Sequence, residues 1–265
     1  MDLGAHAQRC ASAYRDIGEL NAWRKGRNSS RGYDTLTLPS NAWDDRPHDR
    51  YLLVLHGHLT SGAVQLGASS GCYEVGDDHA AVTLARAVFV ESSKVSWLLE
   101  DAIPWTHRAA RAHLELMGDL DSHVRRLPKK LESGYPNFHR KQWQVHRKQL
   151  RDEIVVELFG KRALSRDGDD TTLIGEALLT SAQLEQRFAQ LLANDVVSGT
   201  TVWGPDLLLD AAATIAVRFD TPLTVDSAIV SRAMTLAIDA WIAALLAWVR
   251  YNGWDAVAVE KLAIN

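Results

Sequence analysis

The chain has 265 residues, of which 46% are hydrophobic and 23% are charged, and its formal net charge is −4. This composition is typical of a soluble globular protein. Its two cysteines, Cys10 and Cys72, have neither a paired pattern nor metal-ligand spacing, which excludes a disulfide scaffold. We therefore expect a soluble, cytoplasmic protein with reduced thiols.

Nearly every long segment has helical periodicity, and no run alternates as a strand would. In chain order, the pattern predicts helices over 5–24, 48–67, 78–100, 104–127, 138–159 and 181–195, another after Gly204-Pro205, and a last one over 224–251. Residues 25–47 are expected to form a long loop, and 160–170 a polar loop. Thr180 and Gln183 form a capping box for the helix that follows them. The prediction is one all-α domain, a helical bundle over residues 1–265.

The longest apolar run is Ala233–Val249, with 17 residues and Asp239 inside it. It is short for a membrane span and contains a charge, so we expect a buried core helix and no membrane contact. Trp241 and Trp248 lie seven residues apart on one stripe of this helix, and we expect both in the core.

Positive charge is concentrated between residues 125 and 151. Nine Lys or Arg stand there against one acid, Glu132, which gives +8 and leaves −12 for the rest of a chain of net charge −4. The nine are Arg125, Arg126, Lys129, Lys130, Arg140, Lys141, Arg147, Lys148 and Arg151. An asymmetry of this size favours an anionic partner, and RNA is the partner we expect.

The helix predicted over 138–159 combines these cations with two imidazoles and an indole. One stripe consists of His139, Trp143, His146 and Leu150, and a neighbouring one of Arg140, Arg147 and Arg151. Such a helix could hold phosphates and stack a base. The plainer alternative is a solvated charged face beside an amphipathic contact.

Glu91 falls on the apolar face of the helix predicted over 78–100. A buried carboxylate is costly unless it is paired, so a cation should approach it, and the candidates are Arg86, Arg108 and Arg111. Two interpretations are open: a pocket acid with a raised pKa, or a structural ion pair, including a surface pair with Lys94. No His, Cys or Glu cluster has metal-ligand spacing, and we expect no metal and no cofactor.

Two segments resemble a pattern found in many all-helical bacterial proteins. One runs from Thr83 to Glu91 and continues through Ser96-Trp97-Leu98-Leu99 to an arginine-rich helix with Arg108 and Arg111; the other is Leu191–Thr201. These proteins in turn resemble the HEPN superfamily of helical bundles, which often form dimers. The resemblance implies a HEPN-like homodimer and, since many members are metal-independent ribonucleases with an Arg-x4–6-His motif, cleavage of RNA by its own 2′-hydroxyl.

The chain departs from this pattern at the position of the catalytic histidine, where Ser198 stands. Serine does not relay a proton near neutral pH without an activating base. Two other pairs have the motif spacing, Arg108 with His113 and Arg140 with His146. We prefer Arg140 and His146 as the nuclease pair because they lie in the basic stretch.

Three functions remain open at this point. The first is an RNA-binding or RNA-cleaving HEPN-like protein, with a degenerate catalytic motif, that contacts phosphate through residues 125–151. The second is a small-molecule enzyme or binder with a pocket in the helical core that uses Glu91 and the pocket residues Arg86, Trp97, Arg108 and His113. The third is a non-catalytic interaction protein that uses the bundle as a dimer or partner surface.

Overall fold

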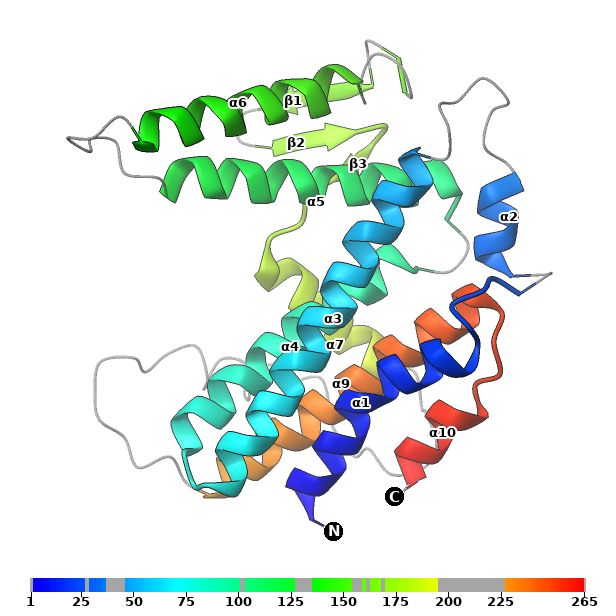
Figure 1. The fold of residues 1–265 in the computed structure, drawn as a ribbon, viewed down its shortest axis with the longest axis vertical. Coiled ribbons are helices and arrows are strands. Elements are labelled where there is room, and N and C mark those ends of the chain that lie inside the picture. Colours follow the sequence, from blue (N-terminus) through cyan, green and yellow to red (C-terminus); the bar gives the residue numbers. More distant parts are fainter. Residues whose placement is uncertain are drawn as a thin grey trace. The chain divides into compact units, whose positions relative to one another are not determined.

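The computed structural model describes residues 2–26, 29–36, 46–100, 103–126, 135–153, 159–160, 163–167, 170–194 and 227–264. Nine helices and three short strands lie in these ranges, so the fold is an all-α helical bundle, as the sequence predicts (Figure 1). Residue contacts divide the chain into two compact units. Unit 1 comprises Met1–Leu36, Leu55–Asp101 and Leu179–Asn265, and unit 2 comprises Thr37–Val54 and Ala102–Leu178. Contact units do not by themselves define domains, so the single domain stays a prediction.

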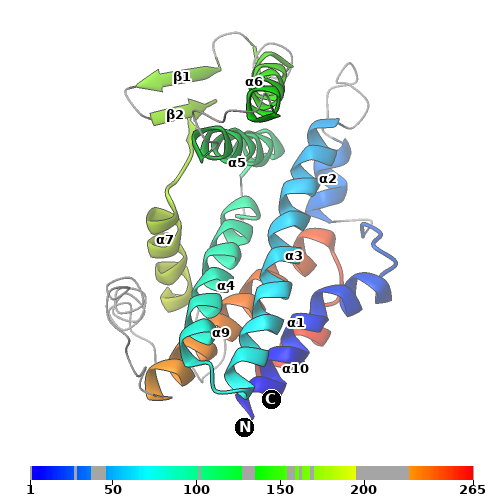
Figure 2. The ribbon, with the colours of Figure 1, turned by 60° about the vertical axis from the view of Figure 1, so that its left-hand side comes forward.

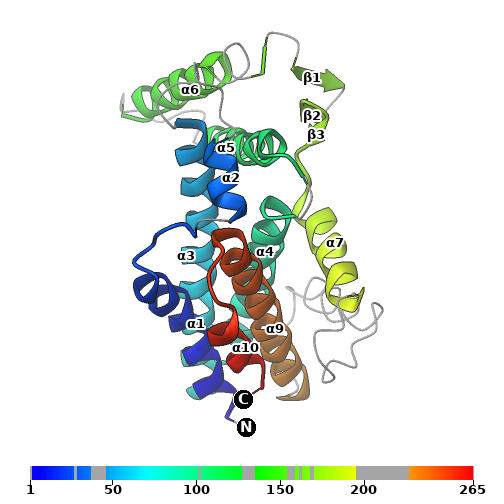
Figure 3. The same ribbon diagram turned by 90° about the vertical axis from the view of Figure 1, so that its right-hand side faces the viewer.

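Unit 1 is a helical bundle around one apolar helix, α9 (Ser227–Asn252). Its other helices are α1 (Leu3–Leu20), α2 (Ser30–Leu36), α3 (Arg46–Glu74) from Leu55 onward, α4 (Asp78–Leu98), α7 (Ser181–Asn194) and α10 (Val257–Ile264). Helices α1, α2, α4 and α10 all contact α9, and Figure 3 shows α1 and α10 against it. Helix α7 packs on α4, which lies between α7 and α3 in Figure 2.

The core of unit 1 confirms the prediction for the last long apolar run. Trp241 and Trp248 on α9 are both fully buried, and the Trp241 indole Nε1 donates to the carbonyl of Cys10 at 2.8 Å. A Cβ at Gly62 of α3 would lie 2.5 Å from the Trp241 ring, so this glycine permits the close approach. By length and hydropathy α9 could cross a membrane, but 67% of its most apolar window is buried inside the protein, as in a core helix.

The ends of several elements differ from the prediction. Helix α2 lies within the predicted long loop, and α3 continues beyond its predicted end at residue 67 as far as Glu74. The sequence of α2 has low helix propensity, but Arg31 donates to the Asn252 side chain at 2.9 Å and the Tyr251 hydroxyl donates to Asp34 at 3.1 Å. Contacts with α9, which the local sequence does not show, therefore stabilise this helix.

The capping box of α7 is confirmed by two reciprocal hydrogen bonds. The backbone N–H of Gln183 donates to Thr180 Oγ1 at 3.3 Å, and the backbone N–H of Thr180 donates to Gln183 Oε1 at 2.8 Å. The helix predicted after Gly204-Pro205 lies outside the described residues.

Unit 2 is built on α5 (Trp105–Arg126), which contacts α6 (Tyr135–Glu153) and a small antiparallel sheet. The sheet has the order β1 (Leu164–Asp167), β2 (Asp170–Leu173), β3 (Glu176–Ala177). Leu173 is opposite Leu164 on one side and Glu176 on the other. The core consists of one stripe of α5 packed on the sheet: Ala110, Leu114, Met117 and Leu173.

The sheet contradicts the prediction of a polar loop without strands. Its strands have two to four residues, too few for an alternating pattern to be visible, and they depend on packing against α5. Ile174 and Gly175 link β2 to β3, with φ angles of 48° and 87°. Two central residues with positive φ are characteristic of a type I′ hairpin turn. An isoleucine pays backbone strain there, and its packing against the α5 core offsets that strain.

Candidate nucleic-acid interface and candidate pocket

Helix α6 has an inner and an outer face. Trp143 and Leu150 are partly buried, and Leu150 packs on the core of unit 2. On the opposite side Lys141, Val145 and Lys148 are exposed at i, i+4 and i+7, with Val145 at 52% exposure. We call these three residues the outer ridge of α6.

The cations of α6 differ in whether a carboxylate neutralises them. Arg147 is paired with Asp121 of α5, with its Nε 2.5 Å from Oδ1 and its Nη2 3.0 Å from Oδ2. Lys141 and Lys148 make no ion pair or hydrogen bond with any residue that the structure describes. Arg125, near the end of α5, is also exposed, and its Nε donates to the backbone carbonyl of Asp121 at 3.3 Å. The outer ridge therefore keeps its positive charge.

Five of the predicted basic residues have no described side chain. Arg126 is the last residue of α5, Arg140 and Arg151 lie in α6, and Lys129 and Lys130 lie outside the described residues. His146 is exposed, and its ring centre is 6.0 Å from that of Trp143. The nuclease pair Arg140 and His146 thus shares one helix and stays a prediction.

Helix α5 also carries many charged residues, and it buries several of them, among them Arg108, Arg111 and Glu115. Arg111 is 4% exposed, and its Nε donates to Glu176 Oε2 of β3 at 2.6 Å; His107 Nδ1 lies 2.8 Å from Glu176 Oε1. Burial pushes the pKa of Glu176 upward, but hydrogen bonds from Arg111 and His107 and the charges of both outweigh it and hold that pKa below its ordinary value. Sequence reasoning missed Glu176, because only the strand pairing brings it to α5.

His113, a predicted pocket residue, is fully buried in unit 2. Its Nδ1–H donates to the carbonyl of Ala109 at 2.5 Å, so its buried Nε2 carries the lone pair and has no hydrogen-bond partner among the described residues. Burial lowers the pKa of His113 to about 4, the bond to Ala109 opposes this, and the charge of Arg50 adds to it. Of the second pair with the motif spacing, His113 is therefore a neutral histidine in the core. Its partner in that pair, Arg108, is also buried, with 7% exposure.

In unit 1 the side chain that meets Glu91 is a histidine and not one of the arginines that the sequence offered. Glu91 Oε2 lies 2.6 Å from His58 Nδ1 of α3, and the side chains of both are more than four-fifths buried. Arg86, which the sequence offered as a partner, instead pairs with Glu185 of α7 at 3.8 Å. The hydrogen bond of Glu91 with His58 therefore joins α4 to α3, and both interpretations of Glu91 stay predictions. The i, i+4 periodicity had placed Glu91 on the inner face, but nothing in it indicated His58.

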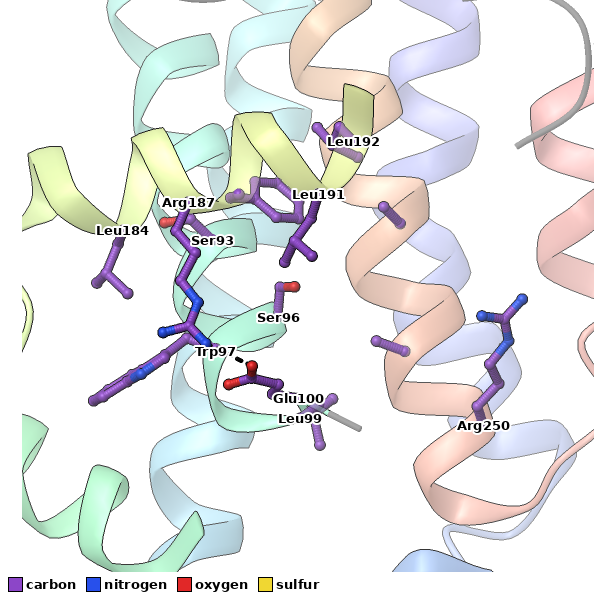
Figure 4. A pocket seen from close by; sticks show the side chains of 13 residues that line it. Ser93, Ser96, Trp97, Leu99, Glu100, Leu184, Arg187, Leu191, Leu192 and Arg250 are labelled. Atoms are coloured by element: carbon purple, nitrogen blue, oxygen red, sulfur yellow. Dashed lines mark hydrogen bonds and ion pairs between the residues drawn. The ribbon is translucent and has the colours of Figure 1, made fainter. Parts of the chain in front are cut away.

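Trp97 is the predicted pocket residue that lines a cavity. A cleft of about 250 Å³ lies between α4, α7 and α9 of unit 1 (Figure 4). Ser96 and Trp97 come from α4, Leu191 from α7, and Ala247 from α9. Arg187 Nη2 of α7 donates to Glu100 Oε1 at 2.5 Å beside the cleft. The sequence predicted none of these polar groups as site residues.

No family model matches the chain, and no curated protein and no solved structure matches it. Among the described residues, no group of three His, Cys, Asp or Glu side chains is arranged to hold a metal ion. Any inference about function therefore rests on the chemistry of the outer ridge and of the cleft.

Proposed function

We propose that the protein binds RNA through the outer ridge of α6. The observation that carries this proposal is that Lys141 and Lys148 are exposed without an acid partner among the described residues, on a helix with no acid before Asp152. The rest of the chain is acidic, so these cations are not part of a generally basic surface. A localised positive ridge attracts phosphate and orients a polyanion on the protein.

The groups around the two lysines suit a nucleic acid better than a free anion. Lys141 and Lys148 are seven residues apart, about 10 Å along the helix, so they address separate phosphates. Gln142, Gln144 and Gln149 are exposed beside them and offer both donors and acceptors to sugars and base edges. The resemblance to the HEPN superfamily supports RNA among the polyanions. Cleavage of that RNA, a homodimer and a cytoplasmic location stay predictions.

The test is the salt dependence of binding to a labelled single-stranded RNA of about 20 nucleotides, followed by fluorescence anisotropy between about 25 and 300 mM NaCl. For the wild type we expect the affinity to fall steeply with salt. Lys141→Gln with Lys148→Gln should weaken binding about tenfold at low salt and make the log–log slope shallower by about 1.4, since each single-strand phosphate contact contributes roughly 0.7.

The matched control replaces two exposed cations of unit 1, Lys25→Gln with Arg232→Gln, and should bind RNA as the wild type does. A flat salt response, or equal losses in the two double variants, would contradict the proposal. Binding to vesicles of anionic lipid but not to RNA would also contradict it. Stronger binding to DNA of the same sequence would assign the ridge to another nucleic acid. A single variant, His146→Ala, separates binding from cleavage: loss of RNA breakdown with unchanged affinity would identify His146 as a catalytic residue.

A further inference from the structure

The cleft in unit 1 exists because two helices that both pack on α4 diverge. At one end α7 and α9 are joined through an apolar cluster in which the rings of Phe89 and Phe188 lie 5.4 Å apart and Leu236 of α9 is buried. Further along, α9 lines the cleft with Ala243 and Ala247 and, in its last turn, with Arg250. Ala243 and Ala247, about one helical turn apart, do not fill the space that larger side chains would, and a cavity of about 250 Å³ is left.

The walls of this cleft are divided into apolar and polar parts. The apolar part of the lining comes from Leu184, Phe188, Leu191 and Leu192 of α7 and from the two alanines of α9. On the α4 side are Ser96 and the ion pair of Glu100 with Arg187. The Ser93 hydroxyl is already bonded to the carbonyl of Val90 at 2.7 Å, whereas Ser96 Oγ has no hydrogen-bond partner among the described residues. In Figure 4, Arg187 reaches from α7 toward Glu100, to which a dashed line joins it, and Ser96 of α4 lines the same cleft.

The charges of the lining favour an anion. Two arginines, Arg187 and Arg250, stand against one acid, Glu100, so the lining has a net charge of +1. Glu100 accepts a hydrogen bond from one nitrogen of Arg187, Nη2, and a guanidinium has five N–H donors in a planar fork. Arg250 is exposed in the last turn of α9. A single carboxylate would bring the charge of this cleft to zero and occupy donors that Glu100 leaves open.

We propose that this cleft binds a small amphipathic monocarboxylate. Its carboxylate accepts hydrogen bonds from Arg187 and Ser96, and its apolar body lies against Leu191, Ala243 and Ala247. A volume of 250 Å³ corresponds to about eight water molecules at roughly 30 Å³ each, which limits the ligand to about eight to ten non-hydrogen atoms. A branched acid with about six carbons, such as 4-methylpentanoate, has this size.

The first experiment holds the apolar body constant and changes the head group. 4-Methylpentanoate, 4-methylpentylamine and 4-methylpentanol are titrated into the full chain, and binding is followed by ligand-observed NMR at concentrations up to about 10 mM. We expect the carboxylate to bind at least about tenfold more tightly than the amine and the alcohol. No binding of the carboxylate in this range, or equal binding of all three compounds, would overturn the proposal.

The second experiment locates the site. Ala247→Leu should fill the cleft and Arg187→Gln should remove the main donor, and each should weaken 4-methylpentanoate at least about tenfold. Ala182→Leu, an equal enlargement at an exposed position of α7 outside the cleft, should bind as the wild type does. Arg187 is 44% exposed, so its variant tests the site even if Ala247→Leu disturbs folding. Unchanged affinity in Arg187→Gln, or equal losses in all three variants, would place the ligand elsewhere. The double variant of the α6 ridge should leave this binding unchanged, which separates it from RNA binding.

Discussion

Helices α5 and α6 pack against each other in unit 2, and both are rich in Arg, Lys and His, yet they use these residues in opposite ways. Helix α5 buries Arg111 and His113, whereas α6 exposes Lys141 and Lys148. The number of charged residues in a helix therefore says little about exposure. What decides is whether the charged position shares the apolar stripe of the helix and whether another element supplies a partner.

The two helices differ in both respects, the position of the charge relative to the apolar stripe and the presence of a partner. Arg111 follows Ala110 and precedes Leu114 of the core stripe, and β3 brings Glu176 within 2.6 Å of it. Lys141 and Lys148 lie opposite Leu150, the core contact of α6, and no described carboxylate reaches them. Buried charges of the first kind stabilise the fold only while they are paired, and exposed charges of the second kind are available to a partner molecule.

The largest expected effect comes from breaking the buried pair. Glu176→Ala leaves the Arg111 guanidinium, 4% exposed, without this carboxylate, so unit 2 should lose about 3 kcal/mol of unfolding free energy in urea. The control is Glu19→Ala, an exposed acid at the end of α1, which should change stability by less than about 0.5 kcal/mol. Equal small effects of both substitutions would show that burial of charge on α5 does not need Glu176.

A second, smaller effect is a pH dependence that belongs to α5. The pKa of His113 is about 4 in the folded protein against 6.5 when unfolded, so its contribution to stability is present above pH 6.5 and is lost as the pH falls toward 4. Between pH 7 and pH 5 this amounts to about 2 kcal/mol. His113→Leu should remove that part of the pH dependence, because leucine does not take up a proton.

Urea unfolding of wild type and His113→Leu at pH 7, 6 and 5 measures this difference. His56 of unit 1, whose burial also lowers its pKa to about 4, is present in both proteins and cancels in the comparison. The series stops at pH 5 so that Glu176 does not affect it. Because the pKa of Glu176 is lowered, its contribution to the free energy of unfolding is lost only at more acidic pH. Parallel pH profiles for the two proteins would mean that folding does not lower the pKa of His113.

Local patterns predicted the described helices except α2 and α10, and they predicted the core positions of α9. The 3.6-residue period placed Trp241, Trp248 and Glu91 on inner faces, and the Thr180 and Gln183 spacing located the start of α7. These signals lie within one element, so a single sequence contains them. The short strands, α2 and α10 escaped prediction because contacts with other elements stabilise them, α5 for the strands and α9 for the two helices.

The partners of the charged residues were beyond sequence reasoning for the same physical reason. His58 meets Glu91 across 33 residues of chain, and Glu176 meets Arg111 across 65. Helical spacing indicates that a charge needs a partner but not which distant residue supplies it. The cleft depends on how α7 and α9 diverge from α4, and of its lining only Trp97 had been predicted as a pocket residue.

Arg147 lies between the two extremes and should show an intermediate response. Its pair with Asp121 joins α5 to α6, but the two side chains are 39% and 30% exposed, so water and salt weaken the attraction. We expect Asp121→Asn to cost at most about 1 kcal/mol, with a smaller cost at high salt. A double-mutant cycle with Arg147→Gln isolates the pair, and a coupling energy as large as the effect of Glu176→Ala would remove the distinction between buried and half-exposed charges.

The smallest effect on stability is expected where the effect on binding is largest. Lys141 and Lys148 contact no described acid, so replacing both with glutamine takes away charge without leaving a buried group unpaired. The free energy of unfolding should change by less than about 0.5 kcal/mol, whereas RNA affinity should fall about tenfold. Urea unfolding and anisotropy on one preparation of this variant measure both quantities. The opposite result, easier unfolding with normal RNA binding, would contradict the proposal. The two lysines of α6 would then stabilise the fold, as the buried charged residues of α5 do.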